Sequence, residues 1–180
     1  MLVVSGLSVG MILATSTIAA PAGAPILGRL ISSSDARHLN FPSVANKPVS
    51  STKTGSKKCP EAAQVVFENH KNVTGLIDQV FSCASRSAAS TYLQALIGEY
   101  PITTSFSPPT ALGSTAVGSA TQAPVYAYMW RRGSYVAFVA VDTDATDNKD
   151  QEYSHRFDLL TKALVASLSK AAIEQNKKMA

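Results

Sequence analysis

The side chains best suited to bind a ligand lie close together in the sequence, where two aromatic-rich runs flank a basic turn. They are Tyr126, Tyr128, Trp130, Arg131 and Arg132. Residues two apart in a strand share one face, so the three aromatic side chains could line a pocket. An arginine pair beside aromatic rings suits an anionic or sugar-like ligand. The sequence therefore predicts a ligand-binding site here. The alternative interpretation is an aromatic stripe in the core beside a solvated turn.

Residues for acid–base or nucleophilic catalysis form no compact cluster in this sequence. None of the three histidines, His38, His70 and His155, is followed by a second histidine three or four residues later. A triad assembled from distant Ser, His and Asp residues stays open as an alternative. We therefore assign no catalytic residue and expect a protein that is not an enzyme.

The densest group of carboxylates runs from Asp142 to Glu152. Hard cations such as calcium prefer several oxygen ligands, but the EF-hand spacing is not matched. Asp147 stands where that loop needs glycine, and Tyr153 stands where it needs a bidentate acid. The preferred interpretation is an acidic turn that caps the following helix through Asp150. We expect neither a metal site nor a cofactor.

Two cysteines, Cys59 and Cys83, are the only ones in the chain. They lack the paired spacing of a zinc site. In an oxidising compartment two thiols in one small domain are best interpreted as one disulfide. That bond would close a loop of about 25 residues and stabilise the fold by roughly 3–4 kcal/mol. The alternative is two separate buried thiols.

The first charged side chain of the sequence is Arg29, and an apolar run from Leu2 to Ala20 precedes it. Small residues in Ala20-Pro21-Ala22 are typical of a signal-peptidase site, so residues 1–22 are predicted to be a cleaved export signal. An uncut anchor and a buried N-terminal element remain the alternatives. Contact with a membrane is expected only if the segment is uncut. The predicted location is secreted or extracytoplasmic, in the cell envelope.

The net charge of +4 comes largely from residues 47–58, which hold four lysines and no acid. This stretch could contact an anionic envelope surface, or it could be a solvated linker. No aromatic residue lies among the lysines, so nucleic acid is not an expected partner.

Hydrophobic periodicity and turn residues predict the elements. We expect a helix over Ser32–Leu39 with Ser34 or Asp35 as its cap, and a helix start over Cys59–Ala63, with residues 64–69 ambiguous between helix and strand. A strand over Gly75–Ala84 and a helix over Arg86–Glu99 follow, then a loop with one strand near Thr115–Gly118. The last elements are a hairpin turning at Gly133 and a helix over Glu152–Lys177.

Together these elements predict an α+β fold: a twisted antiparallel sheet of about four or five strands, flanked by helices and closed by a long C-terminal helix. Residues 23–58 are expected to be an N-terminal segment with a short helix and a Lys-rich linker, and residues 59–180 the α+β domain. Residues 32–180 could also form one domain.

The order of these features is similar to that of a known group of proteins. An export signal, Cys59-Pro60, a strand ending near Cys83 and the string Val125–Val141 around Trp130-Arg131-Arg132-Gly133 resemble small actinobacterial secreted or lipoprotein sensor-like domains. That group includes the extracellular sensor domain of mycobacterial receptor serine/threonine kinases. The likeness spans roughly Ser32 to Lys170. It implies a twisted antiparallel sheet flanked by helices, and a ligand-binding cleft.

The expected function is that of a secreted, non-enzymatic ligand-binding or sensor-like domain of the bacterial envelope. Its partner would be a small molecule or an envelope polymer. One alternative is a structural or protein-interaction component with an envelope protein as partner, and another is a hydrolase with a dispersed Ser/His/Asp site.

Overall fold

The computed structural model describes residues 24–180 except 53–55, 71–73, 101–103, 121–124 and 144–151. The predicted export signal and most of the acidic turn lie outside the described residues. The helices are α1 (Ala24–Leu27), α2 (Ser33–His38), α3 (Arg86–Glu99), a 3-10 turn η1 (Thr110–Leu112) and α4 (Glu152–Lys178). The strands are β1 (Ser43–Ser51), β2 (Glu61–Asn69), β3 (Thr74–Ser82), β4 (Thr104–Phe106), β5 (Val117–Ala120), β6 (Tyr126–Arg132) and β7 (Tyr135–Thr143).

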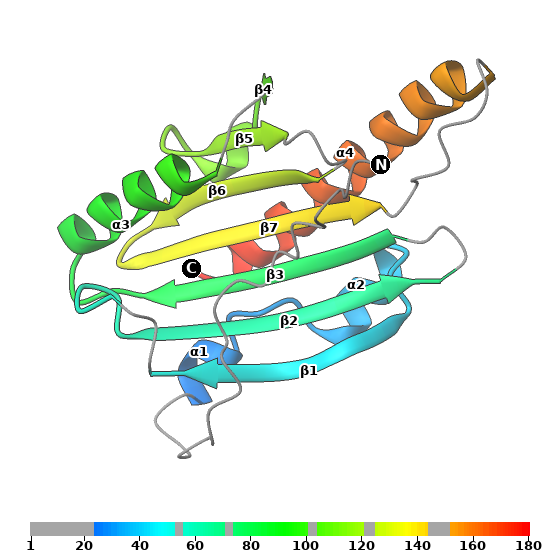
Figure 1. Cartoon of the computed structure of the whole chain (residues 1–180). Coiled ribbons are helices and arrows are strands. Elements are labelled where there is room, and N and C mark those ends of the chain that lie inside the picture. The colour runs from blue at the N-terminus through cyan, green and yellow to red at the C-terminus, as the bar shows by residue number, and fades with distance from the viewer. Residues whose placement is uncertain (1–23, 53–55, 71–73, 101–103, 121–124, 144–151) are drawn as a thin grey trace, which may run out of the picture.

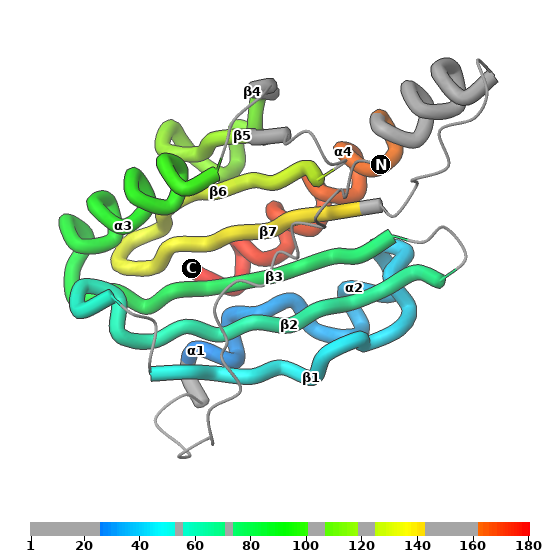
Figure 2. The backbone as a smooth tube through the Cα atoms, viewed as in Figure 1, coloured from blue at the N-terminus to red at the C-terminus, as the bar shows by residue number. Residues whose placement is uncertain are grey.

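The strands form one antiparallel sheet in the order β1-β2-β3-β7-β6-β5-β4. Figure 1 shows α3 on the near side of the sheet and α1, α2 and α4 on the far side. The tube in Figure 2 shows the long central strands twisting across the molecule between these two layers. The predicted α+β class is confirmed, but the sheet has seven strands where four or five were expected.

The extra strands come from stretches whose local signals favoured other structures. The predicted helix start at Cys59–Ala63 is wrong, because β2 begins at Glu61 and pairs with both β1 and β3. Ala63, Val65 and Phe67 alternate into the core, and this period of two outweighs the Pro60-Glu61 helix signal. Pairing with β1 and β3 therefore decides that this segment forms a strand rather than a helix.

The predicted Lys-rich linker is also partly wrong, since residues 47–51 complete β1. This edge strand is irregular, with register shifts between Val44 and Asn46 and between Asn46 and Val49. Lys47 and Pro48 are exposed there. An edge strand tolerates proline and lysine because one of its sides needs no ladder bonds, and both residues discourage pairing with another chain.

Other predicted elements agree closely with the structure. Helix α3 spans Arg86–Glu99 and is capped by Ser85, whose hydroxyl accepts a bond from the Ala88 N–H. The β6–β7 hairpin turns at Gly133, whose φ of 60° favours glycine. Helix α2 is capped by Ser32 rather than by Ser34 or Asp35. Asp35 instead completes a capping box with Ser32.

Each face of the sheet carries its own hydrophobic cluster. On the far face Val65, Phe67, Leu76 and Trp130 pack with residues of α1, α2 and α4. On the near face Met129, Val136 and Phe138 pack with Ala89, Leu93 and Leu96 of α3. The N-terminal segment therefore belongs to the same packed body as residues 59–180: Ile26, Leu30 and Ile31 are buried in the far-face cluster.

The C-terminal end of α4 is held by one buried amide, that of Asn176. Its Oδ1 accepts a bond of 3.1 Å from Trp130 Nε1, and its Nδ2 donates to the Ala111 carbonyl at 2.8 Å. Its own backbone carbonyl accepts a 2.8 Å bond from Arg132. Three elements, β6, η1 and α4, are therefore joined at this residue.

We expect Asn176→Leu to lower the free energy of unfolding by about 1–3 kcal/mol, because it leaves the buried indole N–H without an acceptor. Trp130 is the only tryptophan of the chain. Its fluorescence in a urea titration therefore reports directly on this region. Lys177→Ala, an exposed neighbour on the same helix, is the matched control and should change stability by less than about 0.5 kcal/mol. Equal stability of Asn176→Leu and wild type would contradict the proposed bridge.

Candidate functional site

The structure separates the five residues predicted to bind a ligand. Tyr128 and Trp130 are completely enclosed beneath α4, at 1% and 0% exposure. The Tyr128 hydroxyl lies 3.1 Å from Ser169 Oγ on α4, and burial raises its pKa while that bond lowers it. Tyr126 is half-buried against the same cluster. These three side chains do share one face, as predicted, and on that face they form core.

The two arginines point to opposite faces of the hairpin. Arg132 donates to the Asn176 carbonyl and so holds α4. Arg131 donates to the Gly133 carbonyl at 3.2 Å, and its Nε is buried without a partner among the described residues. Ligand binding by this group therefore stays a prediction. The contacts described above give a structural role to Tyr126, Tyr128, Trp130 and Arg132.

A different surface is open. The far sides of β2 and β3 are buried under helices, whereas their near sides are only half-buried. We call this surface the open face, and it consists of Gln64, Val66, Glu68, Gly75, Ile77 and Gln79. Among the described helices, α3 alone lies on the near side, and it packs on β6 and β7. On the near side, α3 therefore covers the half of the sheet formed by β6 and β7, and no described helix covers the half formed by β2 and β3.

Helix α3 forms a wall beside the open face. Its Tyr92 ring packs on Phe81 of β3 with centroids 4.9 Å apart, and Tyr100 packs on Phe138 at 5.0 Å. Burial, reinforced by the Glu99 carboxylate, raises the pKa of each tyrosine to about 12. Both hydroxyls therefore stay protonated at physiological pH and can donate or accept a hydrogen bond. On the floor, Gln79 Nε2 donates to Gln64 Oε1 at 2.6 Å.

Where β2 ends and β3 begins, the open face forms a cavity of about 270 Å³. Its lining combines apolar side chains with carboxylates and a histidine: Val66, Glu68, Asn69, His70, Thr74, Gly75, Ile77 and Asp142. His70 Nε2 lies 3.6 Å from Glu68 Oε2. A lining that combines apolar side chains with two acids suits a ligand that carries a cationic or hydrogen-donating group on an apolar body.

Gly75 sets the shape of this cavity. It pairs with Asp142 of β7, and a Cβ at position 75 would overlap the Asp142 carboxylate oxygen Oδ1. Any larger residue would push the carboxylate aside. Because glycine has no side chain at position 75, the Asp142 carboxylate can lie across β3.

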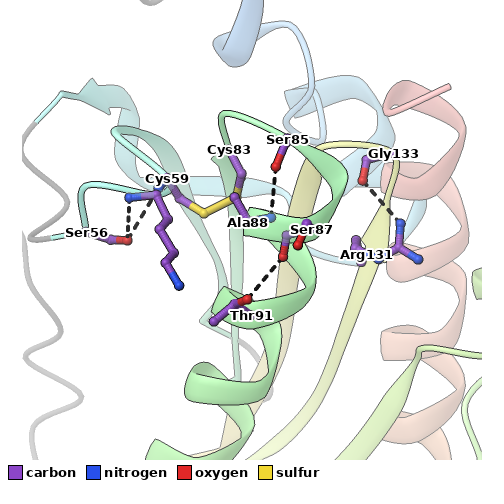
Figure 3. Close-up of a disulfide and its surroundings, with 10 residues drawn as sticks. Ser56, Cys59, Cys83, Ser85, Ser87, Ala88, Thr91, Arg131 and Gly133 are labelled. Carbon is purple, nitrogen blue, oxygen red and sulfur yellow. Dashed lines mark hydrogen bonds between the residues drawn. A yellow bond between two sulfur atoms is a disulfide. The ribbon is translucent and has the colours of Figure 1, made fainter.

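The predicted disulfide is present. Cys59 and Cys83 are joined just before β2 and just after β3. Figure 3 shows the bond beside the first turn of α3, with the cap formed by Ser85 and the hairpin turn of Arg131 and Gly133 in the same region. The Cys83 N–H donates to the Ser134 carbonyl at 2.9 Å, which ties this corner to the hairpin.

Other candidate chemistry finds no support in the described part of the chain. There, no group of three or more His, Cys, Asp or Glu residues is placed to hold a metal ion. His70 contacts Glu68, and neither His38 nor His70 bonds a serine among the residues described. The side chain of His155 lies outside that part.

The sequence of β2 carries a local signal for the open face. In β2, buried Ala63, Val65 and Phe67 alternate with Gln64, Val66 and Glu68, which is the pattern of a strand with one solvated side. The helix-like start at Pro60-Glu61 obscured that alternation. The sequence pattern assigns Asp142 to an acidic turn or a calcium loop, because its structural neighbour Gly75 is distant in the sequence.

The fold has a counterpart among solved structures. The crystal structure of the extracellular domain of PknH from Mycobacterium tuberculosis matches with a TM-score of 0.51 and 10% sequence identity, over 87% of this chain and 97% of that one. The resemblance proposed from the sequence is thereby confirmed at the level of fold. No protein-family model matches the chain, and no curated protein matches its sequence. Among the described helices, none is long and apolar enough to cross a bilayer.

Proposed function

We propose that this protein is an extracytoplasmic, non-enzymatic binding domain with a sensor-like role, and that its ligand lies on the open face. The observation that carries the proposal is the sheet surface beside α3 that no described helix covers, which ends in a cavity with two carboxylates. The disulfide and the fold shared with an extracellular domain support a location outside the cytoplasm.

The ligand is a small molecule or a segment of an envelope polymer. The two carboxylates in the cavity lining favour a ligand with an ammonium or several hydroxyl groups, since charge-assisted bonds are stronger than neutral ones. Val66 and Ile77 favour an apolar portion beside that group. Tyr92 on α3 and Tyr100 directly after α3 would then extend the contact along the wall.

The alternative of a structural or protein-interaction component needs an exposed apolar patch of several hundred Å². Among the described residues, Val44 is the one large hydrophobic side chain that is exposed, at 41%. A single exposed side chain does not make such a patch. The open face is therefore the better-supported site of recognition.

We expect thermal-shift screening of the full chain to find a stabilising compound in a panel of a muropeptide, an envelope glycan fragment and a short-chain phosphatidylethanolamine, which carry hydroxyl or ammonium groups. A ligand at 100 times its Kd stabilises the fold by about 2.7 kcal/mol. Glu68→Gln with Asp142→Asn should weaken such binding about tenfold or more, because each removes a charge-assisted bond.

Glu174→Gln is the matched control, since it neutralises a carboxylate on α4, on the other side of the sheet. It should leave binding of the same compound unchanged. If the Glu68→Gln, Asp142→Asn variant and the control bound the compound equally well, the cavity would not be the binding site.

A further inference from the structure

Positively charged side chains cluster at one end of the molecule. This end, which we call the basic end, is where β2 begins, β3 finishes and the β6–β7 hairpin turns. Its cations are Arg29, Lys57, Lys58, Arg86, Arg131 and Arg132. They come from four separate stretches of the chain, so the sequence alone does not reveal the cluster.

Backbone contacts bring three of these stretches together at the disulfide. The Ala84 N–H donates to the Lys58 carbonyl at 2.9 Å, two residues before Arg86 opens α3. The Cys83 N–H bonds the Ser134 carbonyl in the turn that follows Arg131 and Arg132. The side chains of Lys57, Lys58 and Arg86 are exposed, and none forms an ion pair within the described part of the chain.

Arg29 joins the same end from the N-terminal segment. Its guanidinium lies over the Tyr135 ring, 5.3 Å from the centroid, and Tyr135 pairs with Arg132. Its Nη1 also donates to the carbonyls of Lys178 and Ala180, at 2.6 and 3.1 Å. The chain that leads from Ala24 through α1 therefore enters the domain at the basic end.

Acids at this end do not cancel the charge. Lys177 is paired with Glu174 at 2.6 Å, and Lys178 with Asp35 at 3.0 Å, so these pairs are neutral together. Glu61 at the start of β2 offsets one of the six remaining cations. The cavity with Glu68 and Asp142 lies at the opposite end of β2 and β3. Within the described residues, cations therefore predominate at one end of β2 and β3, and the carboxylates of Glu68 and Asp142 lie at the other.

We infer that the basic end lies against an anionic lipid membrane surface. Lysine and arginine side chains beside such a surface each contribute about 1 kcal/mol of attraction. The uncharged apolar stretch of residues 2–20 joins the domain through Ala24, next to this end. In a chain that keeps this stretch, a membrane engaged by it would meet the basic end first. In a chain cleaved after residue 22, the charge of the basic end alone would provide the attraction. The strands then run away from the bilayer, and the open face and its acidic cavity stay accessible.

The test measures partition of the full chain onto phosphatidylcholine vesicles with 0, 15 and 30% phosphatidylglycerol. Binding should rise with the anionic fraction and fall as salt is added. The triple variant Lys57→Glu, Lys58→Glu and Arg86→Glu should bind the most anionic vesicles at least about tenfold more weakly. The apolar stretch is common to all variants, so any difference between them comes from the domain.

A second triple variant, Arg37→Glu, Lys47→Glu and Lys162→Glu, has the same net charge and changes exposed cations away from the basic end. It should bind within about twofold of wild type. Circular dichroism confirms that both variants are folded. The inference would be overturned if vesicle binding by the wild type did not depend on the anionic fraction. It would also be overturned if both triple variants lost vesicle binding equally. Retention of the wild type on a soluble anionic polysaccharide, without binding to vesicles, would overturn it in favour of a polymer partner.

Discussion

The free energy of unfolding of the wild type will fall strongly as pH rises from about 4 to about 8, and in Asp78→Asn most of this pH dependence will be absent. Asp78 is at 0% exposure, in the middle of the sheet beneath the N-terminal segment. Its Oδ2 accepts a 2.5 Å bond from the Ile31 N–H, and its Oδ1 has no partner among the described residues. This carboxyl therefore holds the segment after α1 to β3.

Burial is the main cause that raises the pKa of Asp78, to about 8. The bond from Ile31 and the charge of Lys178 act in the opposite direction. Lys178 is itself paired with Asp35, which limits its effect. The acid is therefore protonated in the folded state at neutral pH, and its O–H is a hydrogen-bond donor.

The direction of the pH effect follows from proton counting. Between about pH 4 and pH 8 the unfolded chain has released the proton of Asp78, while the folded protein keeps it. Stability therefore falls with rising pH across this window, since the folded state binds more protons. The full difference corresponds to roughly 6 kcal/mol. Below about pH 4 the contribution is complete, and above about pH 8 it is lost.

Urea unfolding of the full chain at pH 5 and pH 8, followed by Trp130 fluorescence, measures this effect. Wild type should be less stable at pH 8 by several kcal/mol, and Asp78→Asn should lose much less. The amide keeps the oxygen that accepts from Ile31 and cannot ionise. At pH 8 the variant should therefore be the more stable protein.

Asp78→Ala separates the charge from the hydrogen bond. It also cannot ionise, but it leaves the buried Ile31 N–H without an acceptor, which costs about 1–3 kcal/mol at both pH values. A wild-type pH profile that persists in both variants would show that another group is responsible.

Removing the disulfide will lower the free energy of unfolding by about 3–4 kcal/mol. The bond joins residues 24 apart in the sequence and so restricts the unfolded chain around β2 and β3. It also fixes the corner where β3 passes into α3, the helix that walls the open face. Loss of the bond should therefore destabilise the site as well as the fold.

The measurement compares thermal unfolding of wild type and the double variant Cys59→Ser, Cys83→Ser. A loss of this size lowers the midpoint by about 10 °C in a domain of this length. Adding a reductant should shift wild type toward the variant and leave the variant unchanged. A reductant that shifts both equally would mean that the effect does not come from this bond.

The sequence alone determined the elements whose signals are local. Helix α3 was predicted within its observed bounds, because Ser85, Pro101 and the spacing of Ala89, Leu93 and Leu96 are all within one stretch. The β6–β7 hairpin was predictable for the same reason: Gly133 supplies the positive φ between two β-rich runs. The two faces of β3 followed from its period of two, with Leu76 and Val80 on one side and Ile77 and Phe81 on the other.

Only the tertiary structure decided which faces are covered, and with that which residues are core and which form the site. Trp130 is core because Asn176, 46 residues later, places α4 over it. Asp78 is buried because Ile31, 47 residues earlier, donates to it. Gly75 and Asp142 meet through the pairing of β3 with β7, and the basic end assembles from four stretches. Periodicity tells which side chains share a face, but what covers that face is set by contacts between residues far apart in the chain.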